Sequence, residues 1–297
     1  MNLFDNQNNQ YVLFSGTSFL EEQDVFRHIN DLFFILFILA KKGIQKENIT
    51  FSVDLEALEY LDKKTRVKKV KLFTAVEQTY QEMIYSSVGH LLDVVNFEKE
   101  FQRDMSKNLV FFASGHGNIH GLSIGKSKTF LSPDYFEKNI VKDKVTFLYL
   151  SQCIAGAFHH LDTRNKIVVL GASEYQSSVS IPIKKLKLTK DHQTIEELFS
   201  FYENIPINPF IYTFFINVLL ADTLIKRESK NILNLYKYIN SNTIELIKND
   251  DVKIYINLSS INKDVVELSI PQKIVQQPYL LNKILATEVL FYNGEEK

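Results

Sequence analysis

Residues 145–156 of the chain are VTFLYLSQCIAG, a largely apolar run that ends in small and polar residues around a cysteine. Short apolar runs of this kind, bounded by turn-forming residues, are typical of a strand that is buried on both faces. A second such run, LVFFASGHGN at residues 109–118, ends in a histidine between two glycines. Because strands buried on both faces occur mainly in parallel sheets covered by helices, these two runs predict an α/β fold.

The alternation of strands and helices extends on both sides of these runs. Further apolar runs that predict strands lie at residues 11–15, 49–53 and 167–171. Residues 24–42 have helical spacing and stop at Gly43, as a helix followed by a glycine does. Residues 54–107 are expected to be mainly helical, and residues 119–124 and 128–131 to pair as a small hairpin. This order implies a mostly parallel sheet flanked by helices.

The pattern changes beyond residue 180. Residues 181–209 lack clear periodicity and contain several lysines, so we expect a loop or flap there. Later expectations are helices at 210–223 and 229–248, a terminal hairpin at 252–258 and 265–270, and a last strand at 289–292. We therefore predict a first domain over residues 1–225 and a C-terminal α+β extension over residues 226–297, packed on the same domain.

The composition restricts the classes of partner. The chain has 34 basic and 35 acidic residues, a net charge of −1, which argues against strong electrostatic attraction to nucleic acid or to an anionic membrane. The apolar stretches at 32–40 and 214–221 are shorter than the about 20 residues that span a bilayer. The opening MNLFDNQNNQ lacks the apolar run of a secretory signal. One cysteine allows no intramolecular disulfide, so we expect a cytoplasmic protein.

Two of the predicted strand ends carry residues with catalytic potential. In parallel sheets the working groups lie beyond the carboxyl ends of the strands. Neighbouring strands are roughly 5 Å apart, so His116 and Cys153 can face each other across a groove. Imidazole exchanges protons near neutral pH, and a thiolate formed with its help is a strong nucleophile. The pair predicts acyl transfer, with backbone N–H groups of Gly117 and Cys153 stabilising the oxyanion.

Each of these residues also has a simpler interpretation. A lone cysteine is often a small buried apolar residue, and Arg27 could be a solvated charge at the start of a helix. Asp31 lies four residues after Arg27, the spacing of a local helical ion pair. Catalysis is favoured because both motifs follow apolar strands, and the 37 residues from His116 to Cys153 fit one crossover connection. No zinc-type Cys/His spacing and no glycine-rich phosphate motif is present in the sequence, so no cofactor or metal is expected.

These blocks resemble the caspase-like cysteine peptidases, and among them the legumain-type branch. LVFFASGHGN and VTFLYLSQCIAGAF are similar to the family's strands that end in the catalytic histidine and cysteine. FRHINDLFFILFILAKKGIQKENITFSVD is similar to its segment in which Arg-His opens the first long helix. VVLGASEYQSSVS is similar to the strand and loop after the nucleophile. The resemblance covers roughly residues 11–225 and implies a caspase-like fold with His116 and Cys153 as the catalytic dyad.

The resemblance also implies a substrate pocket. The implied pocket residues are Arg27 and His28 at its base, Ser177 or Ser178 on its wall, and Ser151 two positions before the nucleophile. Val25 stands where the family often has an amide that orients the catalytic histidine, so no third catalytic residue is assigned. Because Arg27 can hold a carboxylate or amide oxygen and position 151 is not acidic, we expect cleavage after Asp, Asn or a small polar residue.

The implied function is that of a cysteine endopeptidase acting on a protein or peptide substrate. Family members tend to be held inactive until they are cleaved or bound to an activating partner. Residues 181–209 are the segment where such processing is expected, and the alternative is that they form an ordinary solvated loop. Two alternatives stay open. One is a non-catalytic binding or scaffolding protein of the same fold, and the other is a transamidase or ligase in which an amine intercepts the acyl-enzyme.

Overall fold

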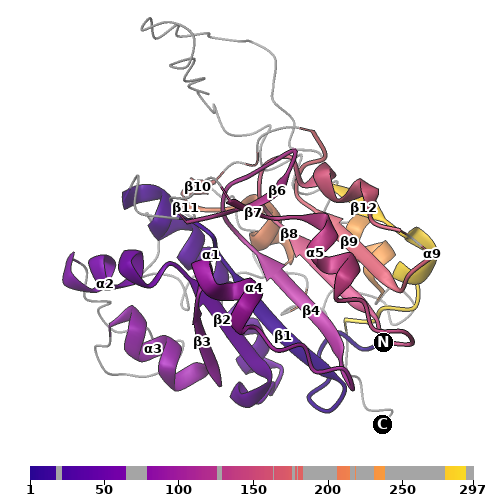
Figure 1. Ribbon diagram of the computed structural model, residues 1–297, viewed down its shortest axis with the longest axis horizontal. Coiled ribbons are helices and arrows are strands. Elements are labelled where there is room, and N and C mark those ends of the chain that lie inside the picture. Colours follow the sequence, from indigo (N-terminus) through magenta and orange to yellow (C-terminus); the bar gives the residue numbers. More distant parts are fainter. Residues whose placement is uncertain are drawn as a thin grey trace, which may run out of the picture.

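The computed structural model describes residues 1–17, 22–64, 79–125, 129–162, 164–175, 178, 180–182, 206–214, 218, 231–237 and 278–291. A central sheet is formed by β1 (Asn9–Phe14), β2 (Ile49–Val53), β3 (His90–Asp93), β4 (Asn108–Ala113), β8 (Thr146–Leu150), β9 (Ile167–Gly171) and β12 (Tyr279–Leu281). The strand order in this seven-stranded sheet is β12-β9-β8-β4-β1-β2-β3 (Figure 1). Only β12 pairs antiparallel, so the predicted α/β fold with a mostly parallel sheet is confirmed.

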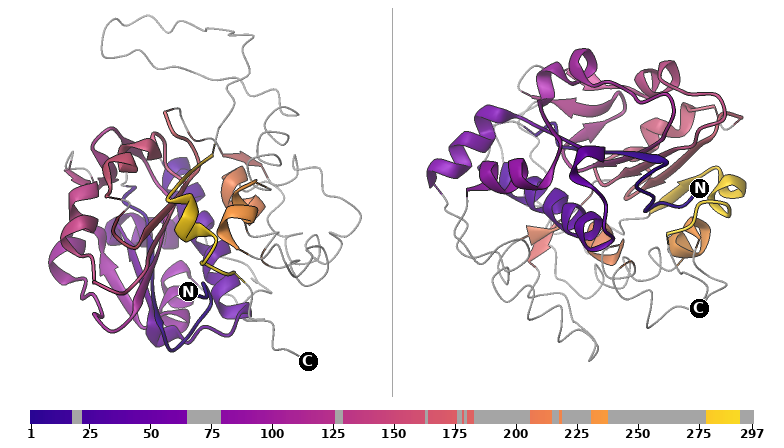
Figure 2. Two further views of the ribbon diagram at one scale, coloured as in Figure 1. Left: turned by 90° about the vertical axis from the view of Figure 1, so that its right-hand side faces the viewer. Right: turned by 90° about the horizontal axis from the view of Figure 1, so that it is seen from below.

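Helices cover both faces of this sheet (Figure 2). They are α1 (Glu22–Lys41), α2 (Leu55–Lys64), α3 (Tyr80–Ser87), α4 (Phe97–Glu100), α5 (Pro133–Lys138) and α9 (Lys283–Ala286), with the 3-10 helices η1 (Lys46–Asn48), η2 (Val94–Asn96) and η3 (Ala155–His160). Residues 209–214 and 232–237 are also helical. No described helix, α1 included, combines the length and the apolar character needed to cross a membrane.

Alternate residues of each strand belong to two separate cores. In β1, Tyr11 and Leu13 face the core shared with α1, whereas Val12 and Phe14 face the core that contains α5 and η3. Successive strand side chains point to opposite faces, so a sheet buried on both sides needs apolar residues at every position. This requirement explains why the strands appear in the sequence as largely apolar runs, in which the few polar residues, such as Thr50, Ser52 and Thr146, are buried as well.

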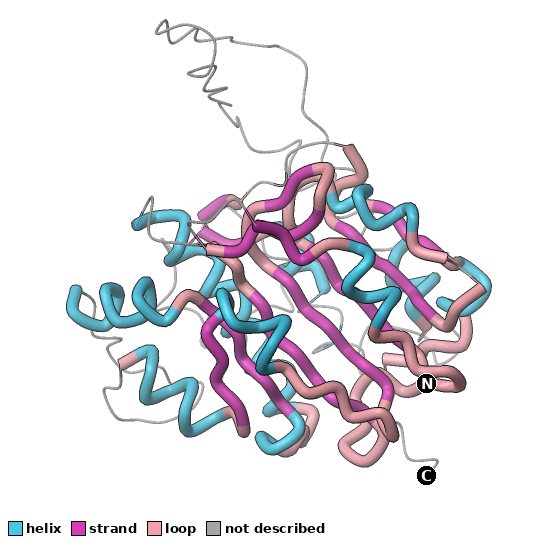
Figure 3. The backbone as a smooth tube through the Cα atoms, in the orientation of Figure 1, coloured by secondary structure: helices cyan, strands magenta, loops and turns pink. Residues whose placement is uncertain are grey.

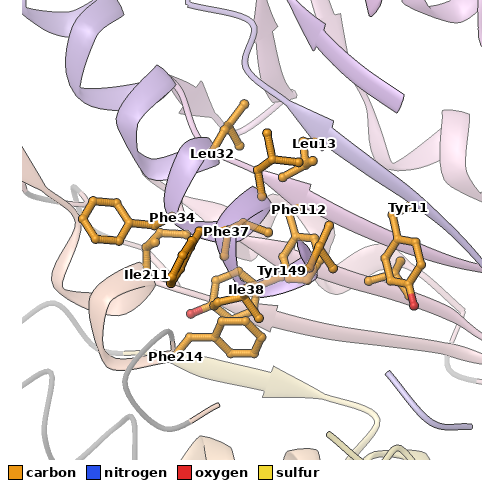
Figure 4. Close-up of a cluster of buried hydrophobic side chains, with 14 of the residues drawn as sticks. Tyr11, Leu13, Leu32, Phe34, Phe37, Ile38, Phe112, Tyr149, Ile211 and Phe214 are labelled. Carbon is orange, nitrogen blue, oxygen red and sulfur yellow. The ribbon is translucent and has the colours of Figure 1, made fainter. Parts of the chain in front are cut away.

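Residues 28–39 of helix α1 are buried because the helix packs on the sheet and against residues 209–214, which also pack on the sheet. In Figure 4, Leu13, Phe112 and Tyr149 of the sheet gather with Phe34, Phe37 and Ile38 of α1 and with Ile211 and Phe214. The ring of Tyr149 stacks on Phe210 with centroids 4.4 Å apart. Residues 207–214 are thereby part of the main core, in which they pack with α1.

Several expectations for the later elements need correction. The described part of residues 54–107 is mainly helical, as expected, but it also contains the strand β3, which was not predicted and which pairs in parallel with β2 at the edge of the sheet. A strand of only four residues has little local signal, and its pairing with β2 defines it. No strand forms at 289–292 among the described residues, because Leu290 makes only isolated bridges to Asn2 and Asn231. The expected hairpin at 252–258 and 265–270 lies outside the described residues.

The C-terminal segment adds the last strand of the central sheet. Strand β12 pairs antiparallel with β9, with Leu280 opposite Leu170. The short strands β10 (Ile181–Pro182) and β11 (Pro206–Ile207) also pair antiparallel, with Ile181 opposite Ile207. Only the two ends of the expected loop at 181–209 belong to the described residues, and this pairing holds those ends together.

Candidate active site

Neighbouring parallel strands carry the predicted dyad. Strands β4 and β8 pair in parallel with Ala113 opposite Leu150. His116 and Cys153 each follow three residues later, so both leave the sheet at the same edge on adjacent strands. His116 is exposed and Cys153 is partly buried. The strand pairing on which the predicted dyad depends is therefore present.

A small second sheet follows His116. It consists of β5 (Gly117–Asn118), β6 (Gly121–Ile124) and β7 (Thr129–Leu131), and β6 and β7 form the predicted hairpin. These strands lie beyond the upper end of the main sheet in Figure 3. The backbone N–H of Ser123 donates to the carbonyl oxygen of His116 at 3.0 Å, which fixes the histidine's backbone to the hairpin.

The backbone turns sharply immediately after Cys153. Ile154 has φ 50° and ψ 43°, a left-handed conformation that is costly for a β-branched residue. The turn is held by bonds from distant segments. Tyr279 Oη donates to the carbonyl of Ala155, and the N–H of Gly156 donates to the carbonyl of Glu174 at 2.9 Å. The surrounding structure thus keeps Cys153 at the start of η3 in a fixed orientation.

The sulfur of Cys153 contacts the backbone of Ser178. The N–H of Ser178 donates to Sγ at 3.2 Å, and Sγ lies 3.8 Å from the carbonyl oxygen of the same residue. Ser178 follows β9, the strand next to β8, so three successive strand ends meet at this site. Ser178 was expected on the pocket wall, and it lies directly beside the thiol.

Gly117 brings the histidine loop against the cysteine loop. A Cβ atom built on Gly117 would lie 2.8 Å from the carbonyl oxygen of Cys153 and would overlap Cγ of Gln152. Heavy atoms do not approach so closely without displacement, so no other residue fits at position 117 unless the two loops separate. This close contact is consistent with the expected use of the Gly117 and Cys153 N–H groups by one oxyanion.

If the Gly117 N–H binds an oxyanion, as the sequence predicts, Gly117→Ala is expected to lower kcat/KM for peptide cleavage by about 10²-fold, because a shift of about 1 Å in such a donor costs that much. The same overpacking should destabilise the fold by about 1–3 kcal/mol, measurable by denaturant unfolding. Gly43→Ala is the matched control, since a Cβ there has no atom within 4 Å and only the φ of +72° is strained. Cleavage by the Gly43 variant should be unchanged, and equal rates for both variants would contradict the tight contact at Gly117.

A chain of buried polar groups lies next to the predicted dyad. Nδ1 of His28 is 2.8 Å from the hydroxyl of Ser114, and this hydroxyl donates to Oδ2 of Asp31 at 2.7 Å. His28 is 4% exposed and Asp31 is 0% exposed. The His28 ring lies edge to face with the ring of His116, with centroids 5.4 Å apart. His28 therefore contacts His116 through its ring.

Asn208 links this chain to the segments around Cys153. Its backbone N–H donates to Oδ1 of Asp31 at 3.0 Å. Its side-chain amide donates to the carbonyl of Ser151 at 3.1 Å and to the hydroxyl of Ser178 at 2.5 Å. One asparagine thus joins the buried carboxylate to the two segments that flank Cys153.

Burial raises the pKa of Asp31 to about 7, although the Asn208 N–H, the Ser114 hydroxyl and the charge of Arg27 all favour the ionised form. The native state therefore keeps a proton that an unfolded chain releases near pH 4. It follows that this group reduces the stability of the native state progressively as the pH rises from about 4 to about 7.

The remaining predicted site residues fall in different places. Nη1 of Arg27 is 3.4 Å from the hydroxyl of Ser180, near the segment that carries Ser178. Ser151, expected in the substrate pocket, is 1% exposed and its hydroxyl donates to the carbonyl of Ala113, so its side chain is not accessible to a substrate. Ser177 and the side chain of Val25 lie outside the described residues.

The simple helical ion pair between Arg27 and Asp31 is a wrong interpretation. Among the described residues, the polar contacts of Asp31 are with Ser114, Asn208 and the more distant His28, whose Nδ1 lies 4.0 Å away. The carboxylate of Asp31 accepts hydrogen bonds from two uncharged donors, the Ser114 hydroxyl and the Asn208 N–H. Arg27 acts on it only through longer-range electrostatic attraction.

Asn208 was not predicted from the sequence as a site residue. A local signal exists, because Asn208 precedes Pro209 and its Oδ1 accepts the N–H of Phe210 at 2.9 Å, as a helix-capping asparagine does. That signal predicts a helix start. It does not predict the bonds to Asp31 and Ser178, which are far away in the sequence.

Comparison with known proteins adds no relative: no family model and no curated protein matches this chain. Among the described residues, no group of three or more His, Cys, Asp or Glu side chains is arranged to hold a metal ion.

Proposed function

We propose that this chain is a cysteine endopeptidase with a caspase-like fold, in which Cys153 is the nucleophile and His116 the general base. The observation that carries the proposal is the register of β4 and β8, which brings both residues to one sheet edge on adjacent strands. The close approach of Gly117 to the Cys153 backbone supports a shared oxyanion site. The resemblance of the surrounding sequence blocks to legumain-type peptidases agrees with this assignment.

The chemistry follows from the groups at this edge. His116 takes the thiol proton, and the sulfur of Cys153 attacks the carbonyl carbon of the scissile peptide bond. The carbonyl oxygen becomes an oxyanion that accepts hydrogen bonds from the N–H groups of Gly117 and Cys153. The amine then leaves with the proton held by His116, giving a thioester. Water, deprotonated by His116, hydrolyses the thioester and regenerates the thiol.

Arg27 is the group that we propose for recognition of the residue before the cleaved bond. Its guanidinium approaches Ser180, two residues from the segment that touches the Cys153 sulfur. A guanidinium binds carboxylate and amide oxygens through directed hydrogen bonds. The preferred residue is therefore Asp, Asn or another small polar residue.

A peptide-library cleavage profile tests both the function and the preference. The unaltered protein should cleave after Asp or Asn, and Arg27→Ala should lower kcat/KM for the Asp substrate by about 30-fold, the loss of one charge-assisted hydrogen bond of about 2 kcal/mol. Arg164→Ala is the control, because Arg164 is exposed and pairs with Asp162. Cleavage after Lys or Arg would contradict the assigned preference. Absence of cleavage, together with no labelling of Cys153 by peptide electrophiles, would contradict the function.

A further inference from the structure

Asp31 lies in the middle of a continuous path between the proposed base and the proposed nucleophile. On one side the path passes through Ser114 and His28 to the ring of His116. On the other side it passes through Asn208 and Ser178 to the sulfur of Cys153. Every hydrogen bond between Asp31 and the His28 ring is at most 2.8 Å, and the hydrogen bonds on the Cys153 side lie between 2.5 and 3.2 Å.

The donors and acceptors along this path can be assigned. The backbone N–H of Asn208 can only donate, so Oδ1 of Asp31 is always an acceptor. When Asp31 is ionised, Oδ2 is an acceptor as well, and the Ser114 hydroxyl must donate to it. The oxygen of Ser114 then presents a lone pair to Nδ1 of His28, so the imidazole must carry a proton on Nδ1.

Loss of the charge reverses this chain. A protonated Asp31 carries its proton on Oδ2 and donates it to the oxygen of Ser114. The Ser114 hydroxyl then donates to Nδ1 of His28, and a neutral imidazole has its proton on Nε2. The charge of one buried carboxylate thus selects the tautomer of the ring that lies against His116.

We propose that Asp31 is a positioning residue: its carboxylate fixes the tautomer of His28 behind His116 and, through Asn208, holds Ser178 against the Cys153 sulfur. The charged or titratable groups that act on it are Arg27 and His28 on its own helix and Tyr149 on β8. The consequence for catalysis rests on the proposed peptidase function, whereas the tautomer of His28 does not depend on that function.

Nitrogen NMR of the histidine side chains in the full-length protein tests the hydrogen-bond chain directly. At pH 8 the unaltered protein should show His28 protonated on Nδ1. In Asp31→Asn the amide oxygen faces the Asn208 N–H and the amide N–H donates to Ser114, so His28 should be protonated on Nε2. Asp62→Asn is the control. Asp62 also has a raised pKa and accepts hydrogen bonds from backbone N–H groups, but it lies on α2, outside the candidate site. The same tautomer in the Asp31 variant and in the unaltered protein would overturn the proposal.

The pH dependence of cleavage supplies the second test. Asparagine resembles the protonated carboxyl group, so Asp31→Asn should match the unaltered protein at pH 6 and fall about tenfold below it at pH 8, where the charge-assisted bonds are lost. The change should appear in kcat more than in KM. The alkylation rate of Cys153 by iodoacetamide should follow the same pH pattern. If the ratio of the variant's activity to that of the unaltered protein is the same at pH 6 and pH 8, the positioning role is overturned.

Ser114→Ala is a second variant, which gives a result even if Asp31→Asn fails to fold. It keeps the hydrogen bond between Asp31 and Asn208 but removes the hydroxyl that joins Asp31 to His28. The preference of His28 for a proton on Nδ1 should therefore be lost. An unchanged preference for the Nδ1 proton would contradict the proposed series of hydrogen bonds from Asp31 to His28. If the unaltered protein cleaves no peptide, the peptidase proposal fails, while the NMR result still decides whether Asp31 controls His28.

Discussion

Cys153→Ala is expected to lower kcat/KM for peptide cleavage by at least about a thousandfold, because the variant has no group that can form the thioester. Cys153 is the one cysteine of the chain, so no other thiol can take over. The sulfur is partly exposed and its hydrogen bonds are to the Ser178 backbone, so thermal unfolding should change little. Initial rates on the best library peptide, together with a melting curve, measure both effects.

Cys153→Ser separates the nucleophile from its hydrogen bonds. The serine hydroxyl can still accept from the Ser178 N–H, but an alcohol is a much weaker nucleophile than a thiolate. Both variants should therefore lose cleavage to a similar extent. Cleavage at the unaltered rate in the alanine variant would exclude Cys153 as the nucleophile and would contradict the proposed thioester mechanism.

His116→Ala is expected to lower kcat/KM by about 10³-fold, the usual contribution of a general base. His116 is exposed, so its removal should leave the melting temperature nearly unchanged. The alkylation of Cys153 at neutral pH should slow as well, because no imidazole then assists loss of the thiol proton. Steady-state cleavage and the iodoacetamide rate measure these two effects independently.

His120 provides the matched control for this variant. It is an exposed histidine that follows the same short strand β5, and its ring packs near Phe130. His120→Ala should cleave at the unaltered rate. Equal losses in the His116 and His120 variants would indicate that damage to the hairpin, and not the missing base, explains the loss.

The sequence predicted the strands that are buried on both faces because burial is encoded locally in them. The runs at 109–113 and 167–171 contain apolar residues at every position, and such runs have few alternative structures. Their order along the chain, with helices between, was enough to predict parallel neighbours and to bring His116 and Cys153 to one edge.

The elements that were missed depend on contacts between distant parts of the chain. Strand β3 has four residues and β12 has three, too few for a periodic pattern, and each is defined by the strand that it pairs with. The same limit applies to Asn208, whose partners Asp31 and Ser178 are 177 and 30 residues away. A buried hydrogen bond over such a distance leaves no trace in local composition.

The pairing of β10 with β11 has a consequence for a chain that is cut once between residues 182 and 206. The fragment after the cut would contain Asn208, the helical residues 209–214 and β12, all of which contact elements of the first fragment. Phe210, Ile211 and Phe214 are 0% exposed, so separation of the fragments would expose a large apolar surface to water. The cut protein would therefore persist as a tightly bound heterodimer, with the proposed dyad of His116 and Cys153 on the larger subunit and Asn208 on the smaller one.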